Sequence, residues 1–221
     1  VDVPAANVDI SLDGRSAVST VSYQDGGYNL QDVKPGNYKL ILSHRGFNGY
    51  KSEIIKIKEG DVKKDFNFSL LPKDPSCEIY SDRYTFVIGQ QLGFNLKTLR
   101  LEKVKLKLYR LPLEIVLQGH TDADKINPDT AGLKLIKEWE ESIKDFTPYE
   151  WREQHVEIPA ALPSGGYCIE VKGENKIVSR KFFSVTSIGI VVKRSLNYIF
   201  AYTVNLATNK PVGEAPVFIL I

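Results

Sequence analysis

Short runs of alternating hydrophobic and polar residues fill most of the chain. Between residues 1 and 71, the clearest run places Tyr38, Leu40 and Leu42 on one face of a strand that follows a Pro-Gly turn. About six such runs follow one another at regular spacing without a helical period, which is typical of a small antiparallel sandwich. Residues 1–72 are therefore predicted to form a first β-sandwich domain.

The sequence Pro72-Lys73-Asp74-Pro75 interrupts this pattern. Two prolines bar a helix and stiffen the backbone, which is typical of a linker between domains. The strand pattern resumes at residue 76 and continues, with one interruption, to residue 186. We therefore predict a second β-sandwich over residues 76–186.

One strand of the second domain alternates an aliphatic residue with lysine. Its residues are Lys103, Val104, Lys105, Leu106, Lys107 and Leu108. The lysines could form a basic patch for an anionic ligand, or they could be the solvated face of a sheet, where they discourage edge pairing. We favour the solvated face because no aromatic side chains are interleaved with the lysines to stack on a ligand.

The interruption in the second domain has a different period. Apolar residues recur there at steps of three and four residues, namely Leu133, Ile136, Trp139, Ile143 and Phe146. With Asn127 as the cap and Pro128 at the first position, this pattern predicts an amphipathic helix over about 128–145. Its apolar face could pack on its own sandwich or remain exposed for a partner, and we favour packing.

Residues 187–221 contain two further strand-like runs and end in an apolar stretch from Pro216 to Ile221. They are too few for a sandwich, and an exposed apolar strand invites edge-to-edge aggregation. We expect them to open a third domain whose remainder is absent, which would make this chain a fragment of a longer protein.

The composition excludes several classes of function. The 221 residues are 43% hydrophobic and 25% charged, and the net charge is +2. Such a balanced charge does not indicate a nucleic-acid or membrane-surface partner. No stretch approaches the roughly 18 uncharged apolar residues of a membrane-spanning helix, so none is predicted in this chain.

The two cysteines, Cys77 and Cys168, both fall in the predicted second domain. They could form a structural disulfide there. We favour two buried thiols, because so few cysteines without a recognisable motif do not indicate a disulfide framework.

No catalytic or metal centre is predicted. His44, His120 and His155 are far apart, and no two of them share a metal-ligand spacing. The loop at 120–129 is rich in oxygen ligands, but its glycine is misplaced for a calcium loop, so a polar surface loop is expected. Phosphate-binding and nucleophile-elbow motifs are absent. We therefore expect no enzyme activity and no cofactor.

The stretch VSYQDGGYNLQDVKPGNYKLILSHRGF resembles the carboxypeptidase-regulatory-like (transthyretin-like) domain over about 60 residues. The matching features are the Asp25-Gly26 turn before Tyr28, the Pro35-Gly36 turn, the strand with Tyr38 and the Gly46-Phe47 step. This resemblance implies a sandwich fold for residues 1–72. It does not specify a function, because such domains are appended to many secreted proteins.

Motifs after residue 75 are similar to the N-terminal macroglobulin domains of bacterial alpha-2-macroglobulin-like proteins. They are the Leu108-Tyr109-Arg110 strand end, the turn with Leu162-Pro163 and Gly165 before Tyr167, the Gly189 to Lys193 strand and the turn at Asn205–Val212. The resemblance implies a macroglobulin-like sandwich over 76–186, with the next macroglobulin-like domain beginning at 187–221.

The best-known members of that family trap proteases, and some carry a thioester in a Cys-x-Glu-Gln motif. Here Cys168-Ile169-Glu170-Val171 has valine in place of the glutamine, so no thioester is expected. The resemblance implies a non-catalytic scaffold segment of a secreted, cell-envelope protease inhibitor, whose trapping function lies largely outside this chain.

The same resemblance implies where the protein works and what it meets. It suggests the periplasm or the cell surface, with a lipid anchor attached through a missing N-terminus, and proteases or other cell-envelope proteins as partners of the full-length molecule. The alternative is a surface-exposed binding or adhesion module for a protein or carbohydrate ligand.

Overall fold

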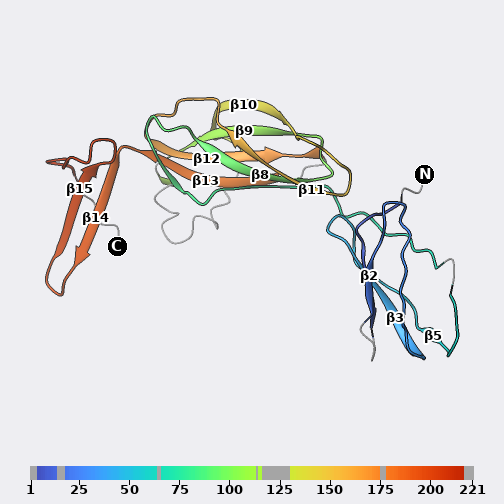
Figure 1. The fold of residues 1–221 in the computed structure, drawn as a ribbon. Helices are drawn as coiled ribbons and strands as arrows, with labels where there is room; N and C mark the ends of the chain where they lie inside the picture. Colours follow the sequence, from blue (N-terminus) through green and yellow to red (C-terminus); the bar gives the residue numbers. More distant parts are fainter. Residues whose placement is uncertain are drawn as a thin grey trace. The chain divides into compact units, whose positions relative to one another are not determined.

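The computed structural model describes residues 4–13, 18–63, 66–112, 114–115, 130–174 and 178–216. In these residues the chain is mainly β, with several antiparallel sheets and one parallel pairing, between β13 and β7 (Figure 1). The predicted fold class, tandem antiparallel β-sandwiches, is confirmed. No helix among the described residues has both the length and the apolar composition that crossing a bilayer requires.

The chain divides into two compact units. The first comprises Val1–Asp74 together with Thr147–Trp151, and the second comprises Pro75–Phe146 and Arg152–Ile221. The main change of unit therefore falls between Asp74 and Pro75, within the Pro-rich stretch. Nothing in the sequence pattern indicated that residues 147–151 would belong to the first unit.

The first unit is built on one antiparallel sheet in the order β2-β1-β3-β4, with β5 also paired to β3. The strands are β1 (Asp9–Asp13), β2 (Ser19–Val21), β3 (Gly36–Ser43), β4 (Tyr50–Lys51) and β5 (Ile55–Ile57). Val8, just before β1, and alternate residues of β1 and β3 face inward and form the buried core; the strand residues are Ile10, Leu12, Tyr38, Leu40 and Leu42.

Two segments outside the ladders cover this core. Tyr28, Leu30 and Val33 pack on it from one segment, and Phe68 and Leu70 pack on it from the other. Residues 67–70 alternate outward and inward as a strand does, whereas in the first segment Asp32, with a φ of +58°, breaks the alternation between Leu30 and Val33; neither segment is part of a sheet. The second layer of this sandwich is therefore made of extended chain without a continuous ladder.

The second unit has two facing sheets. One has the order β10-β9-β12-β13-β7 and the other has the order β11-β8-β6. Their bounds are β6 (Ser76–Tyr80), β7 (Thr85–Val87), β8 (Gly93–Leu99), β9 (Lys103–Leu111), β10 (Lys134–Ser142), β11 (Trp151–Glu157), β12 (Gly165–Lys172) and β13 (Val178–Thr186).

The core of the second unit lies between these sheets and is rich in aromatic rings. Phe183 on β13 contacts Phe86, Phe94 and Tyr167, at ring-centroid distances of 5.7, 5.1 and 5.5 Å. Tyr167, Ile169 and Val171 of β12 are fully buried in it. This is the central strand, and its burial explains the almost uninterrupted apolar run that the sequence shows there.

The predicted helix at about 128–145 is wrong, because Lys134–Ser142 is strand β10, paired with β9. A register shift between Leu135 and Lys137 interrupts the pairing. Trp139 and Ile143 pack on the core between the sheets, whereas Leu133 packs on the opposite face of the β9–β12 sheet. The extra residue of the bulge reverses the facing of the residues before it, so Leu133 and Trp139, which are six residues apart, lie on opposite faces of the sheet. The apolar residues therefore recur at steps of three and four, as they would in a helix. Asn127 and Pro128 lie outside the described residues.

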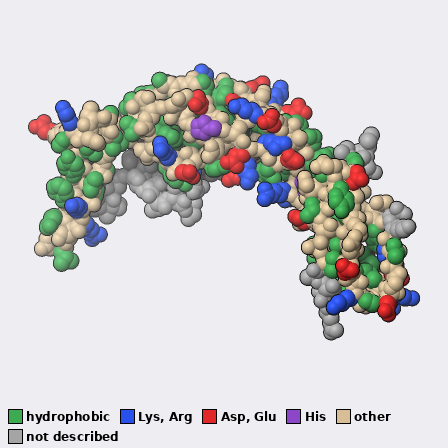
Figure 2. Space-filling view, viewed as in Figure 1, with side chains coloured by type: hydrophobic (Ala, Val, Ile, Leu, Met, Phe, Trp, Pro, Cys, Tyr) green, Lys and Arg blue, Asp and Glu red, His purple; other side chains and the backbone are tan. Residues whose placement is uncertain are grey.

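The last described strands form a separate two-stranded sheet. β14 (Ile188–Arg194) pairs with β15 (Ile199–Asn205) along its whole length. Large apolar side chains on both faces are exposed, including Ile190, Val192, Tyr198 and Phe200. Hydrophobic side chains are prominent on the face of this hairpin seen in Figure 2. The apolar residues 217–221 lie outside the described residues.

Candidate functional site

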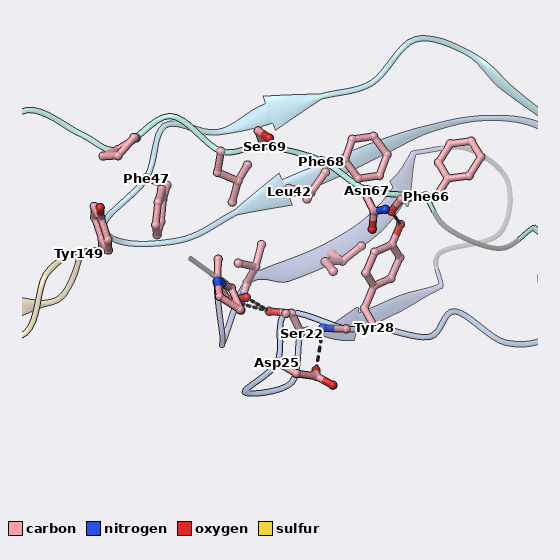
Figure 3. A pocket seen from close by; sticks show the side chains of 18 residues that line it. Ser22, Asp25, Tyr28, Leu42, Phe47, Phe66, Asn67, Phe68, Ser69 and Tyr149 are labelled. Carbon is pink, nitrogen blue, oxygen red and sulfur yellow. Dashed lines mark hydrogen bonds between the residues drawn. The ribbon is translucent and has the colours of Figure 1, made fainter. Parts of the chain in front are cut away.

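A groove of about 740 Å³ in the first unit is the candidate site (Figure 3). Its floor is apolar and comes from the main sheet, with Val8 and Ile10 from the first strand region and Leu42 from β3. The segment from Phe66 to Pro72 forms one wall, and the turn from Ser22 to Tyr28 contributes to the other. A groove of this size is within the range of ligand-binding pockets.

Ser22 fixes the wall nearest β1. Its hydroxyl accepts a hydrogen bond from the Val8 amide at 2.9 Å and donates one to the Ala5 carbonyl at 2.7 Å. The Ser22 amide also donates to the Val8 carbonyl, at 3.0 Å. This buried hydroxyl is fully engaged in holding the wall, so it has no donor left for a ligand.

Asp25 lies at the tip of the tight turn that the sequence predicts. Its Oδ1 accepts a hydrogen bond from the Gly27 amide at 2.8 Å, and Gly26 has a φ of +78°, which favours glycine. Asp25 is the only charged residue among the described residues that line the groove. Its second carboxylate oxygen gives the rim a negative charge.

Tyr28 closes one end of the groove. Its hydroxyl donates a 2.9 Å hydrogen bond to the carbonyl oxygen of Phe66 (Figure 3). Burial raises the pKa of the Tyr28 phenol, which keeps it protonated and able to donate. A second groove of about 660 Å³ shares Tyr28 and Phe66 with the first, and its floor includes Leu40, Ile55 and Ile57.

The other end of the groove is aromatic. The rings of Phe47 and Tyr149 are stacked, with centroids 4.8 Å apart. The indole N–H of Trp151 donates to the carbonyl of Arg45 at 3.2 Å, and a Cβ on Gly46 would overlap the carbonyl of Tyr149. The backbones approach so closely here that only glycine fits at residue 46 without a shift of the main chain.

The groove therefore offers an apolar floor, aromatic ends, one carboxylate and exposed main chain. The described residues that line it include serine, asparagine and tyrosine side chains, and no His, Cys, Lys or Arg occurs among these described residues. Such a set provides contact area and hydrogen bonds, which suits binding more than acid–base chemistry.

Cys77 and Cys168 are both buried and free. Cys77 packs in the core between the sheets, and Cys168 packs with Tyr109 and Phe182 on the opposite face of the β9–β12–β13 sheet. The structure therefore has no disulfide between them. Burial raises the pKa of the Cys168 thiol to about 12, so it is protonated at neutral pH.

The lysines of β9 are not a free basic patch. Lys105 and Lys107 both pair with Glu138 of β10, at 3.1 and 3.0 Å. Across the sheet, Glu138 lies opposite Lys107, Lys107 lies opposite Glu170, and Glu170 lies opposite Arg180. This alternating row of charges, the ionic row, neutralises the lysine face internally.

The described histidines serve local structure. The Nδ1 of His44 accepts a hydrogen bond from the Gly46 amide at 3.0 Å, and burial lowers the pKa of this imidazole. The Nδ1 of His155 lies 3.3 Å from Oδ1 of Asn95. No group of three or more metal-ligating side chains occurs within the described ranges. His120 and the acidic loop at 121–129 lie outside them.

Sequence reasoning missed the groove as a site, although it noted some of its residues. Asp25, Gly26 and Tyr28 appeared as turn features, and the alternation of Phe66 and Phe68 is visible in the sequence. Tyr149 gave no signal, because it joins the groove from a segment more than a hundred residues away from Phe47.

Comparison with known proteins places the first unit in a recognisable class. The sequence model of the carboxypeptidase regulatory-like domain matches residues 2–71. No curated protein matches the chain by sequence.

The structural comparison extends over most of the chain. Native alpha-2-macroglobulin from Escherichia coli spanning domains MG0-NIE-MG1 is 14% identical, with a TM-score of 0.50, over 92% of this chain and 69% of that one. A second structure of the same protein, spanning domains NIE-MG1, is 13% identical with a TM-score of 0.47, over 62% of this chain and 73% of that one. The resemblances predicted from the sequence are confirmed, by sequence for the first unit and by fold for the longer span.

Proposed function

We propose that this chain is a non-catalytic scaffold segment of an alpha-2-macroglobulin-like protein of the cell envelope. The observation that carries the proposal is the likeness in fold to the MG0-NIE-MG1 segment of such a protein, across nearly the whole chain. The carboxypeptidase regulatory-like domain at residues 2–71 is compatible with it, since small sandwiches of this kind are common appended modules.

The β14–β15 hairpin supports the domain organisation of this proposal. It has apolar side chains on both faces, and within the described residues its sheet has two strands; an isolated hairpin is marginally stable in water. In our proposal, residues 187–221 open a further macroglobulin-like domain whose other strands cover these faces. Residues 1–72 and 76–186 are then the complete sandwiches that precede it.

In this proposal the role of the whole protein is protease trapping outside the cytoplasm, and proteases are its partners. The test is an inhibition assay on the full-length protein with trypsin. Trapping predicts that trypsin loses activity on a large protein substrate and keeps activity on a small chromogenic peptide, because a cage excludes only the large one. The 221-residue chain alone should inhibit neither reaction.

Two outcomes would overturn the proposal. One is a full-length protein that leaves both trypsin activities unchanged even when it is cleaved. The other is a hydrolase or transferase activity of the 221-residue chain itself, which would contradict the proposal that this segment is non-catalytic.

A binding module is the second candidate, and the groove of the first unit is the observation that favours it. The two functions are compatible in one protein, because the groove and the scaffold fold are separate features.

A further inference from the structure

The wall of the groove formed by residues 66–70 is a strand without a partner. Phe68 and Leu70 point into the core, whereas Asn67 and Ser69 are exposed, which is the two-residue alternation of a β-strand. No hydrogen bond joins the backbone of residues 67–70 to another described residue, although the neighbouring Leu71 carbonyl accepts from the Asn48 amide at 2.8 Å. Strand-like backbone with free N–H and C=O groups is a template for pairing with another chain.

The hydrogen bond from Tyr28 shows which edge of this strand faces the groove. The Phe66 carbonyl points toward the Tyr28 hydroxyl, across the end of the groove (Figure 3). In an extended chain, the N–H and C=O of one residue point to the same side and the side reverses at the next residue. The main-chain groups of Phe68 and Leu70 therefore face the groove, and those of Asn67 and Ser69 face away from it.

The side chains around the groove are already engaged with one another. Phe47 stacks on Tyr149, and the Phe68 ring contacts those of Tyr50 and Phe66 at centroid distances of 5.4 and 5.8 Å. The hydroxyl groups of Ser22 and Tyr28 are committed to carbonyls of the wall. The groups left for a ligand are the side chains of Asn67 and Ser69 and the backbone of residues 67–70, and a row of backbone groups at strand spacing favours a peptide.

Charge adds a further preference. Asp25 is the only charged group among the described residues that line the groove, and its turn leaves Oδ2 free at the rim. Opposite charge at an exposed rim favours one class of partner and fixes its orientation more than it adds affinity. The partner should therefore carry a lysine or an arginine at the position that lies beside Asp25.

We propose that the groove binds an extended strand of a partner polypeptide by β-strand addition. The strand pairs with the main chain of Phe68 and Leu70, places alternate apolar side chains toward the floor at Ile10 and Leu42, and presents a basic residue to Asp25. At about 3.3 Å per residue, the wall from Phe66 to Pro72 accommodates five or six residues of partner. This inference does not depend on the proposed scaffold function.

The test uses the 221-residue chain and the acetylated, amidated peptide Val-Lys-Val-Thr-Val-Thr. Amide hydrogen exchange is followed by NMR with and without the peptide. We expect slower exchange at Phe68 and Leu70, with Asn67 and Ser69 unchanged. A control peptide with proline at the third position should bind about tenfold more weakly, because it lacks an N–H of the ladder.

Matched variants separate the two parts of the proposal. Asp25→Asn keeps an oxygen for the Gly27 amide and removes the charge, so it should weaken the lysine peptide about two- to fivefold and leave a peptide with Thr in place of Lys unaffected. Phe66→Ala should weaken both peptides. Leu71→Ala is its control, because Leu71 is 73% exposed and does not line the groove.

Three results would overturn the inference. Equal protection of all four amides, or of none, contradicts the assigned edge. Equal affinity for the proline peptide contradicts strand pairing. Binding of a soluble oligosaccharide such as cellohexaose, without binding of either peptide, would show that the groove is a carbohydrate site. Thermal melts of each variant confirm that the chain remains folded.

Discussion

Glu170 on β12 and Arg180 on β13 lie directly opposite each other, and the guanidinium group holds a carboxylate that has no exposed surface. Nε and Nη2 of Arg180 are both 2.7 Å from Oε2 of Glu170. Burial by itself would raise the pKa of Glu170, but Arg180 and then Lys172 outweigh burial and hold this pKa below its ordinary value.

Arg180→Ala should destabilise the second unit strongly. Removal of one partner of a buried pair costs about 3–5 kcal/mol in the free energy of unfolding when the other charge is left uncompensated. Lys172 remains 3.3 Å from Oε1 of Glu170 in this variant, so about 3 kcal/mol, the lower end of that range, is expected. Glu138→Ala, at the exposed end of the ionic row, is the control and should cost much less, because solvent screens its ion pairs with Lys105 and Lys107. Urea unfolding of both variants measures the difference. Equal losses would contradict the buried character of the Glu170–Arg180 pair.

The pH dependence of stability should also depend on Glu170. A carboxyl group with a lower pKa in the folded state stabilises the fold above its unfolded pKa, and this contribution is lost as the pH falls through the folded pKa. The ordinary pKa of a glutamate, which applies to the unfolded chain, is 4.5, so the contribution of Glu170 to stability is complete at neutral pH. This contribution declines as the pH falls below that ordinary pKa. Compared with Glu170→Gln, the wild type should therefore lose more stability between about pH 7 and about pH 3. Parallel pH profiles would show that Glu170 does not titrate as described.

Trp139→Ala should destabilise the second unit, because this half-buried indole packs on the core between the sheets. Full burial of a tryptophan would make the cost about 3–5 kcal/mol, so about 2 kcal/mol is expected here. Ile136→Ala at the bulge is the control, because Ile136 is among the exposed side chains. If the two chemical denaturation midpoints shift equally, Trp139 does not serve the core.

Both thiols should be unreactive in the folded chain. Cys168 has no exposed surface and a pKa of about 12, so almost no thiolate reaches a thiol reagent at neutral pH. A colorimetric disulfide reagent should detect no thiol in the native chain and both thiols in guanidinium chloride. Methylamine should neither change the mass nor release a thiol. A newly released thiol at Cys168 would mean that a thioester forms despite Val171.

Gly46→Ala should loosen the first unit, because the added Cβ would overlap the Tyr149 carbonyl. Such overpacking costs about 1–3 kcal/mol, and flexible chain can move away to relieve part of it. Gly49→Ala is a close control, because its Cβ would be 3.8 Å from the Leu42 carbonyl, an ordinary contact. Thermal unfolding of the two variants provides the comparison, and equal midpoints would exclude the close approach.

Much of the fold was predictable, because each sandwich is specified by local alternation. The strand around Tyr38, Leu40 and Leu42 was predicted correctly since its period and its preceding turn agree. The helix was wrong because a bulge near Ile136 imitates a helical period. The opposing charges of Lys105, Lys107 and Glu138 were a signal for strand pairing that could have corrected it.

The groove could not be predicted in the same way. Asp25, Phe66 and Tyr149 belong to three separate segments, and only the folded chain brings them together. A strand without a ladder partner also looks like any other strand in the sequence, because alternation reports which face is buried and not which edge is paired.

The parallel pairing of β7 with β13 has a consequence for the order of folding. It places Phe86 beside Val185, so the edge of this sheet cannot form until about a hundred residues of intervening chain have been made. Contacts between residues so far apart in the sequence slow folding. Until they form, the unpaired edges of the sheet are exposed to other chains. During synthesis the five-stranded sheet of the second unit must therefore wait for β13, whereas the β1–β3 pairing of the first unit can form long before, from residues already outside the ribosome.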